Sequence, residues 1–113
     1  METINRSIAI IRPKQPFVDW ANQLPDKGWE SKLSDFQTDC LSLLIPEYDT
    51  DDEAKKYINS IALDIFEEEL FGWCTYEHWW PKKLTKKMFW EWFEVELHSV
   101  VRDMIDEPII KTD

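Results

Sequence analysis

The chain is poor in glycine and cysteine and contains no long apolar run. Its 113 residues include two glycines, too few for a glycine-rich loop that cradles phosphate. Two cysteines cannot build a disulfide framework in a chain of this size. The first residues lack the pattern of a signal peptide, and no apolar run is long enough for a membrane span. These features predict a cytoplasmic protein with reduced thiols, and a protein exported by a specialised secretion system would share them.

Basic side chains are also scarce. Thirteen Lys and Arg stand against twenty-three Asp and Glu, a net charge of −10. Such a charge repels nucleic-acid phosphates and anionic lipid, so we expect neither direct nucleic-acid binding nor membrane binding. It favours a protein partner with a basic surface, although acidity can serve solubility alone. Seven Trp, six Phe and three Tyr provide enough apolar surface for a packed core, which argues against disorder.

The first half of the chain predicts two strands and a helix, punctuated by prolines. The run SIAIIR over residues 7–12 is rich in β-branched residues and predicts a strand. Apolar residues at helical spacing over residues 17–24 predict a short amphipathic helix. Residues 26–38 are polar and predict a long loop or a loop with one helical turn. The nearly continuous apolar run CLSLLI, residues 40–45, predicts a central strand buried on both faces.

The second half predicts two helices and a last strand. Thr50 and Glu53 have the spacing of a capping box, and apolar residues recur at three and four from 54 to 70, with Gly72 as the C-cap. Residues 84–93 predict a further helix and residues 95–104 a strand. The predicted fold is α+β, a small three-stranded sheet with about three helices in the order β-α-β-α-α-β. Residues 1–105 form one domain, and 106–113 a flexible tail.

The acidic charge is concentrated in the middle of the chain. Residues 39–77 hold eleven acidic and two basic side chains. Glu67, Glu68 and Glu69 fall near the predicted end of a helix, where the helix dipole disfavours negative charge. The lysines at 82, 83, 86 and 87 lie near a helix start, which is the opposite anomaly. We expect the two clusters to face each other, or else one of them to meet a partner.

Tryptophans gather in the last third of the chain. Trp79 and Trp80 are adjacent, so both indoles cannot point inward from an extended segment, and at least one should reach the surface. Trp90 lies two positions from the inward Trp92 and cannot fully share its helix face. Tryptophan is a leading hot-spot residue at protein interfaces. Most of the cluster should pack in the core, and a binding groove lined by Trp79, Trp80 and Trp90 is the functional alternative.

Motifs for catalysis or cofactor binding are lacking. The sequence has no G-x-S-x-G, Walker or H-E-x-x-H pattern, so we expect no cofactor and name no catalytic residue. Cys74 and His78 are four apart and could share a helix face as metal ligands. A structural zinc site needs about four ligands, and the remaining candidates, Cys40 and His98, are distant in sequence. We therefore predict no metal site.

Several segments together resemble a family of small uncharacterised bacterial proteins. The segments are Asn5-Arg6-Ser7, Arg12-Pro13-Lys14-Gln15-Pro16-Phe17-Val18-Asp19-Trp20, Phe66-Glu67-Glu68-Glu69-Leu70-Phe71-Gly72-Trp73, Trp80-Pro81, Trp92-Phe93 and His98-Ser99. The resemblance covers most of the chain and implies a bacterial origin and a compact domain, but no activity. It also places Arg12, Lys14 and Gln15 between the first strand and a helix start, a position that can hold anions.

Three hypotheses of function follow from these observations. The first is an acidic protein-binding module that meets a basic partner through Trp79, Trp80 and Trp90, steered by Glu67, Glu68 and Glu69. Its partner could be a nucleic-acid-processing enzyme, which an effector, an inhibitor or an antitoxin would modulate. The second is a small enzyme or a domain that binds an anionic ligand with Arg12, Lys14 and His98. The third is a homo-oligomer with a structural role, for instance a homodimer.

Overall fold

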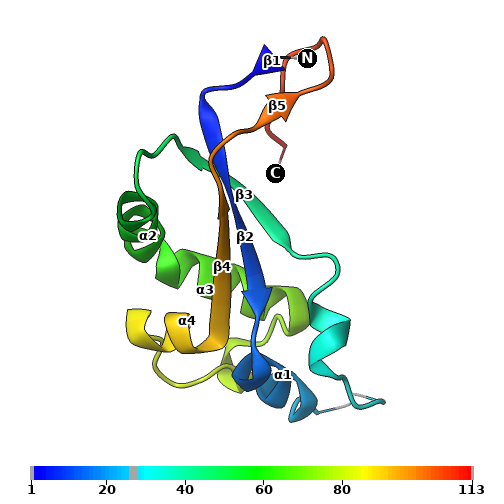
Figure 1. Cartoon of the computed structure of the whole chain (residues 1–113). Coiled ribbons are helices and arrows are strands. Elements are labelled where there is room, and N and C mark those ends of the chain that lie inside the picture. The colour runs from blue at the N-terminus through cyan, green and yellow to red at the C-terminus, as the bar shows by residue number, and fades with distance from the viewer. Residues whose placement is uncertain (1, 26–27, 113) are drawn as a thin grey trace.

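The computed structural model describes residues 2–25 and 28–112. Its main sheet is antiparallel, with β2 (Arg6–Pro13) between β3 (Leu41–Pro46) and β4 (Phe93–His98) (Figure 1). A two-stranded ribbon of β1 (Glu2–Thr3) and β5 (Arg102–Asp103) extends the structure beyond one end of this sheet. The α+β class and the small three-stranded sheet are therefore as predicted.

The central strand β2 has the alternation that its sequence predicts. Ser7, Ala9 and Ile11 are buried on one face, whereas Ile8 and Ile10 are partly exposed on the other. The register places Ala9 opposite Leu43 on β3 and opposite Leu97 on β4, so one face of all three strands carries apolar side chains. This face packs against the helices.

The prediction that residues 40–45 form a central strand buried on both faces is wrong. β3 is an edge strand, and its side chains alternate between the covered and the open face. Ile45 is buried, but Leu44 is 47% exposed on the open face. The apolar run was misleading because helices cover only one face of this sheet, so that Leu44 is apolar without being buried.

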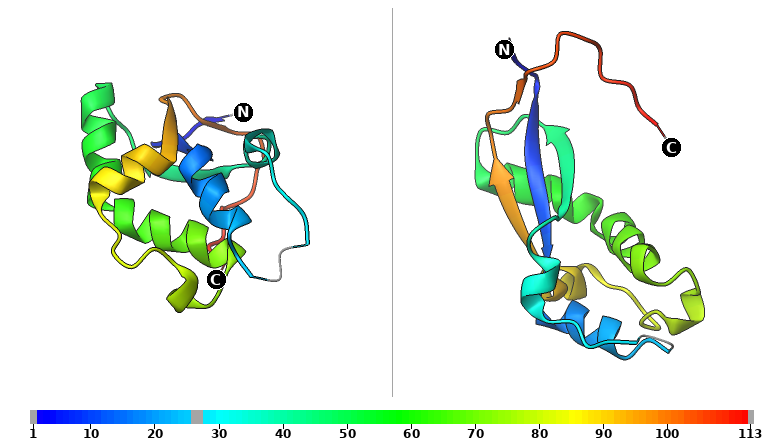
Figure 2. Two further views of the ribbon diagram at one scale, coloured as in Figure 1. Left: turned by 90° about the horizontal axis from the view of Figure 1, so that it is seen from below. Right: turned by 90° about the vertical axis from the view of Figure 1, so that its right-hand side faces the viewer.

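The helices α1 (Gln15–Asn22), α2 (Asp51–Ser60), α3 (Ala62–Trp73) and α4 (Lys86–Trp92) lie close to the predicted segments. Two short 3-10 helices, η1 (Leu33–Phe36) and η2 (Glu77–Trp79), lie in the connections. The helix α1 and η1 lie at the end of the molecule opposite the β1–β5 ribbon, and α2 and α3 pack beside the sheet (Figure 2). Within the described residues, no helix is long and apolar enough to cross a bilayer.

The single helix expected over residues 54–70 is divided into α2 and α3. The Ser60 hydroxyl donates a hydrogen bond to the Tyr57 carbonyl, which a continuous helix would offer to the Ile61 amide. The Ile61 amide instead donates to the Ile58 carbonyl (3.1 Å), and the helix restarts from there. Serine at this position competes with the backbone for its acceptor, and the apolar periodicity continues through the break.

The structure confirms the predicted N-cap of α2 and contradicts the predicted C-cap of α3. The Thr50 hydroxyl accepts from the Glu53 amide (3.2 Å), as the capping box predicts, although the Glu53 carboxylate accepts from the Asp49 amide rather than from that of Thr50. Gly72 is not the C-cap, because α3 continues to Trp73. Cys74 caps the helix in an extended conformation, with its amide donating to the Leu70 carbonyl (2.9 Å).

Aromatic rings form the centre of the core between the sheet and the helices. Phe66 of α3 lies 5.3 Å from Phe93 and 5.2 Å from Trp92, measured between ring centroids. Phe17 of α1 lies 5.3 Å from Phe93 on the other side. Rings at these separations add about 0.5–1.5 kcal/mol per pair beyond the burial of their area. The core thus fixes α1 and α3 against the same strand.

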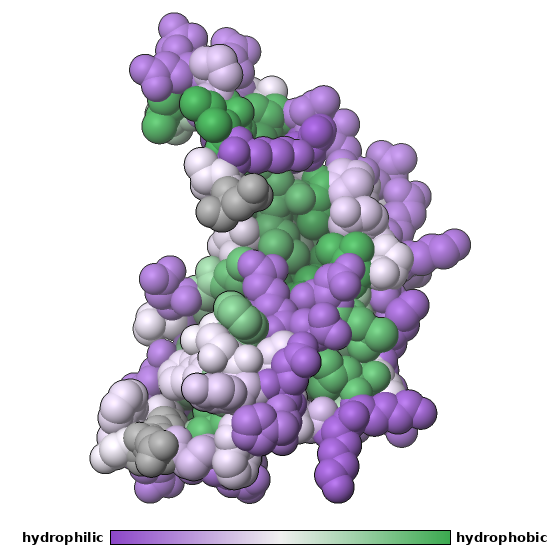
Figure 3. All heavy atoms as spheres, turned by 180° about the vertical axis from the view of Figure 1, so that it is seen from behind, coloured by the Kyte–Doolittle hydropathy of each residue, from purple (hydrophilic) through white to green (hydrophobic). Residues whose placement is uncertain are grey.

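The open face of the sheet leads to the C-terminal segment. Residues 104–112 form neither helix nor strand, and Ile109 and Lys111 line a recess with Leu44 and Ile4. Seen from behind, apolar surface is exposed in a hollow below the end of the molecule that carries the termini (Figure 3). The flexibility expected of residues 106–113 stays a prediction.

Candidate protein-binding recess

A recess opens where the end of α3 meets the end of α1. Its volume is about 360 Å³, and it is lined by Leu24, Pro25, Phe71, Gly72, Trp73, Cys74, Thr75, Tyr76 and Trp79. Four large aromatic side chains of this lining are exposed: Phe71 by 57%, Trp73 by 41%, Tyr76 by 65% and Trp79 by 46%. The recess therefore presents aromatic surface to solvent at one place on the molecule.

Hydrogen bonds from two buried or half-buried indoles hold the walls of the recess in place. The Trp80 indole donates to the Cys74 carbonyl (2.8 Å), which closes the segment between them into a loop. The Trp20 indole of α1 donates to the Trp79 carbonyl (3.0 Å), which ties η2 to α1. Both bonds end on backbone oxygens, so the Trp79 side chain is not needed for either. The recess is thus built before any ligand binds.

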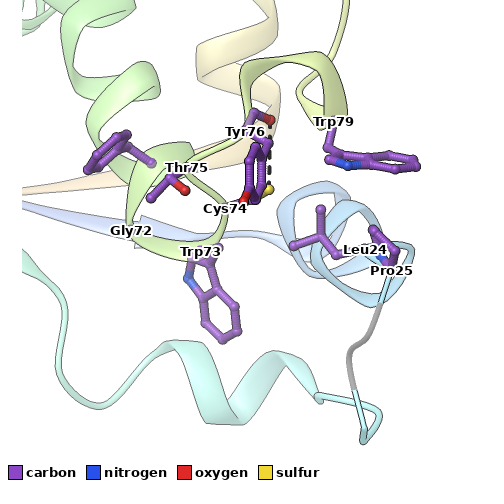
Figure 4. Close-up of a pocket in the computed structure, with 9 residues that line it drawn as sticks. Leu24, Pro25, Gly72, Trp73, Cys74, Thr75, Tyr76 and Trp79 are labelled. Atoms are coloured by element: carbon purple, nitrogen blue, oxygen red, sulfur yellow. Dashed lines mark hydrogen bonds between the residues drawn. The ribbon is translucent and has the colours of Figure 1, made fainter.

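The exposed rings line the recess from two sides. Trp79 lies over Leu24 and Pro25, and Tyr76 lies beside Cys74 (Figure 4). The Trp73 indole points the other way, toward η1, where it stacks on Phe36 with a centroid separation of 4.6 Å and an interplanar angle of 16°. Stacking on a buried ring fixes the orientation of Trp73 although that side chain is half exposed.

His78 extends the aromatic surface along η2. Its ring centroid lies 5.6 Å from that of Tyr76 and 5.2 Å from that of Trp79. The His78 ring therefore contacts both of the other rings. This arrangement limits their rotation and reduces the entropy that a partner must remove when it binds.

The segment that forms most of the recess is acidic and has no Lys or Arg. Residues 61–80 provide seven of the nine described residues that line it and hold five Asp and Glu. Glu67 and Glu68 are exposed on α3 one turn before Phe71 and Gly72. Glu69 is partly buried, and burial, followed by the neighbouring Glu68 charge, raises its pKa from 4.5 to about 7. The recess is thus in a negative field.

The structure does not unite Trp79, Trp80 and Trp90 in one groove. Trp79 lines the recess and confirms that one indole of the adjacent pair reaches the surface. Trp80 is half-buried behind it. Trp90 lies on α4, where its indole donates to the Asn59 side chain of α2 (3.0 Å), and it does not line the recess. Helix α4 carries Trp90 to the α2 side of the molecule, which the sequence spacing could not show.

The sequence pattern missed three of the aromatic residues that line the recess. The sequence pattern assigns Trp73 and Tyr76 to the tryptophan-rich region but does not indicate them as binding residues. It gives no reason to single out Phe71 at the end of the predicted helix. A signal was available in the α3 sequence, since Phe71 is off the buried face that Phe66 and Leu70 define. An aromatic residue at an exposed helix position just before other aromatics is typical of a surface cluster.

The expected pairing of Glu67, Glu68 and Glu69 with the lysines does not occur. Among residues 2–25 and 28–112, no ion pair joins Glu67–Glu69 to the lysines at 82, 83, 86 and 87. The reason for the expectation also disappears, because α3 continues to Trp73 and the glutamates lie in its middle rather than in its last turn. The dipole penalty falls off within the terminal turn, so it needs no compensation here.

Arg12, Lys14 and His98 do not converge on a shared anion site. Glu96 accepts from Arg12 (3.4 Å) and contacts the His98 ring (2.9 Å), and these contacts lower the pKa of its carboxyl, the His98 bond most. Arg12 also donates to the Gln37 carbonyl (2.7 Å). Lys14 donates to the Trp90 carbonyl (3.2 Å), away from this group. A carboxylate of the chain thus contacts two of the three side chains predicted to bind an anion.

The two cysteines lie in different surroundings. Burial raises the pKa of the Cys40 thiol, and Arg12 opposes this rise without cancelling it. The Cys74 sulfur contacts the Tyr76 carbonyl (3.7 Å). Over the described ranges, no group of three or more His, Cys, Asp and Glu is placed to hold a metal ion.

A further recess contains His98 but offers it acidic neighbours. Tyr48, Asp49, Asp51 and Ser99 share its lining. Two aspartates beside the histidine disfavour an anionic ligand there. The aromatic recess is therefore the better candidate for a binding site.

Comparison of the chain with models of protein families, with characterised proteins and with solved structures found no match.

Proposed function

We propose that the protein is a binding module that holds a partner protein with a basic surface at the aromatic recess. The observation that carries this proposal is the distribution of phenylalanine. Five of the six phenylalanines are buried, and the sixth, Phe71, is 57% exposed beside Trp73, Tyr76 and Trp79. The chain buries its other phenylalanines and exposes this one in a recess beside tryptophan and tyrosine, which are the residue types enriched at interface hot spots.

The lining of the recess supports binding rather than catalysis. Among the described residues, those that line it include no Asp, Glu, His, Lys or Arg. Asp, Glu, His and Lys are the side chains that most often act as general acids and bases. Aromatic and aliphatic walls with charges outside them are instead the arrangement of an interface, with an apolar centre and a polar rim.

The charge of the chain indicates the kind of partner. Residues 39–77, which include all of α2 and α3, hold eleven acidic and two basic side chains. A field of this sign speeds the approach of a basic surface and repels acidic ones. Enzymes that process nucleic acids have basic clefts, so an inhibitor or modulator of such an enzyme fits this description.

Affinity purification of the tagged protein from its host's lysate tests the proposal. We expect a stoichiometric partner that is lost when Tyr76 and Trp79 are both changed to alanine. Tyr57→Ala is the matched control, because Tyr57 is an exposed tyrosine on α2 outside the recess. Circular dichroism should show that all variants fold.

Retention of the partner by the double variant would refute the proposal. Loss in the Tyr57→Ala control as well would show that the interface lies elsewhere. If the wild type captures only itself, size measurement in solution would identify a homo-oligomer, which is the structural alternative.

A further inference from the structure

The aromatic recess has two properties that together specify a ligand. Its lining includes the exposed aromatic residues Phe71, Trp73, Tyr76 and Trp79, and the segments that form it carry negative charge. We propose that the recess receives the guanidinium group of an arginine side chain from the partner. This inference rests on the proposed function, since it names the group of the partner that enters the recess.

The aromatic faces provide the first part of the argument. A cation within about 6 Å of an aromatic centroid is attracted by the negative face of the ring, and tryptophan is the strongest such partner. Tyr76 and Trp79 are exposed by 65% and 46%, and the His78 ring centroid lies 5.6 Å from that of Tyr76 and 5.2 Å from that of Trp79. A side chain that enters beside Trp79 therefore meets exposed aromatic rings as well as the aliphatic Leu24 and Pro25.

The charge of the segments that line the recess provides the second part. Residues 15–25 and 61–80, which contribute all of the lining residues in the part of the chain that the structure describes, contain six Asp and Glu and no Lys or Arg. No Lys or Arg of these segments can therefore compete with an incoming cation. Glu67 and Glu68 are exposed one turn before the lining residues Phe71 and Gly72, so their charges add to the attraction of a cation toward this side of the molecule.

The shape of the site favours arginine over lysine. The guanidinium is planar, stacks on aromatic rings and is more weakly hydrated than an ammonium group, so less hydration is lost when it enters an aromatic recess. Tyr76 and Thr75 provide hydroxyl groups on the lining that can accept its N–H donors. The volume of about 360 Å³ lies within the range of sites that hold small ligands, so one side chain can enter.

Peptide titration monitored by tryptophan fluorescence tests the proposal with the whole protein. The probe is a short Gly-Arg repeat peptide, compared with peptides in which every arginine is replaced by lysine, by citrulline or by leucine. Citrulline keeps the size and planarity of arginine and removes its charge. We expect the arginine peptide to bind roughly ten-fold tighter than the citrulline peptide, as cation–π attraction at a partly desolvated site implies.

Two substitutions at one position separate cation–π attraction from apolar contact. Trp79→Phe keeps an aromatic face, whereas Trp79→Leu keeps apolar surface without one. We expect Trp79→Phe to retain most of the preference for arginine over citrulline and Trp79→Leu to lose it, about a ten-fold effect. Both variants should fold, because the Trp20 indole bonds the backbone carbonyl of Trp79 and not its side chain. Tyr57→Ala should bind like the wild type.

Equal binding of the arginine and citrulline peptides would overturn the inference, and so would absence of binding. Tighter binding of the leucine peptide would show that the recess is an apolar contact. Tighter binding of the lysine peptide would show that charge alone matters. In each of these cases the proposed function survives if the partner protein is still lost with Tyr76→Ala and Trp79→Ala, so the two failures are distinguishable.

Discussion

Replacement of Glu69 by glutamine should stabilise the protein, and the gain should depend on pH. Burial, and then the charge of Glu68, raises the pKa of Glu69 from 4.5 to about 7. Between these values the folded protein keeps the proton that the unfolded chain releases. Stability therefore falls as pH rises from about 4.5 through about 7, because the folded state binds more protons than the unfolded state.

The size of the effect follows from the two pKa values. Each pH unit between the two pKa values lowers the free energy of unfolding by up to about 1.4 kcal/mol. The rise from 4.5 to about 7 thus sets an upper limit of roughly 3 kcal/mol at pH 8. Glu69 is only partly buried, and solvent screens the charge, so we expect a gain of about 1–2 kcal/mol for Glu69→Gln at pH 8.

Urea unfolding followed by tryptophan fluorescence measures this gain. The free energy of unfolding of Glu69→Gln should exceed that of the wild type at pH 8, and the difference should shrink severalfold at pH 5. Glu67→Gln is the matched control, since it neutralises an exposed carboxylate on the same helix and should change stability by less than about 0.5 kcal/mol. A gain equal at both pH values, or no gain at pH 8, would refute the argument from burial.

Two further substitutions test the structure away from the recess. Thr50→Ala removes the acceptor of the Glu53 amide (3.2 Å), and thermal unfolding should show a loss of about 1 kcal/mol, whereas an unchanged midpoint would contradict the cap. Trp90→Phe removes the indole bond to Asn59 (3.0 Å) and should cost about 1 kcal/mol in urea unfolding. Because Trp90 does not line the recess, the partner should be retained, and its loss would place the interface on α4.

Most elements of the fold could be predicted because their signals are local. The strand β2 and the helix α1 are delimited by prolines, and the Thr50 cap marks the start of α2. The predicted strand over residues 95–104 is confirmed in part, as β4 and the short β5. Prolines and caps act on the backbone within a few residues, so the sequence alone specifies them.

The errors in the fold arise where a distant element decides the outcome. Whether Leu44 is buried depends on the number of sheet faces that helices cover, and an apolar run carries no information about this number. The sequence does not predict the break between α2 and α3 at Ile61, because Ile61 continues the apolar spacing of its neighbours. Only its amide, which donates to the Ile58 carbonyl, departs from the helical pattern. Periodicity reports which side chains face the core, but not which carbonyl each amide bonds.

The same limit applies to the candidate site. The density of aromatics after residue 70 coincides with the segment that forms most of the recess, and the adjacency of Trp79 and Trp80 correctly placed one indole at the surface. Trp90 was assigned to this region by sequence distance, but α4 reverses the chain and carries it toward α2. Which residues lie on the same surface depends on how the helices pack, and a local sequence pattern does not specify this packing.

Trp20, Trp80 and Trp90 differ from Trp79 in the use of the indole N–H. Trp20, Trp80 and Trp90 are at least partly buried, and each donates its N–H to an acceptor of the chain. An indole N–H that is buried without an acceptor would lower the stability of the protein by about 1–3 kcal/mol. These hydrogen bonds therefore permit the burial of the three indoles. Trp79 is held by its backbone carbonyl instead, which leaves its ring available at the surface. The indoles of Trp20 and Trp80 fix the backbone around Trp79, and the structural tryptophans thereby present the one that we expect to bind.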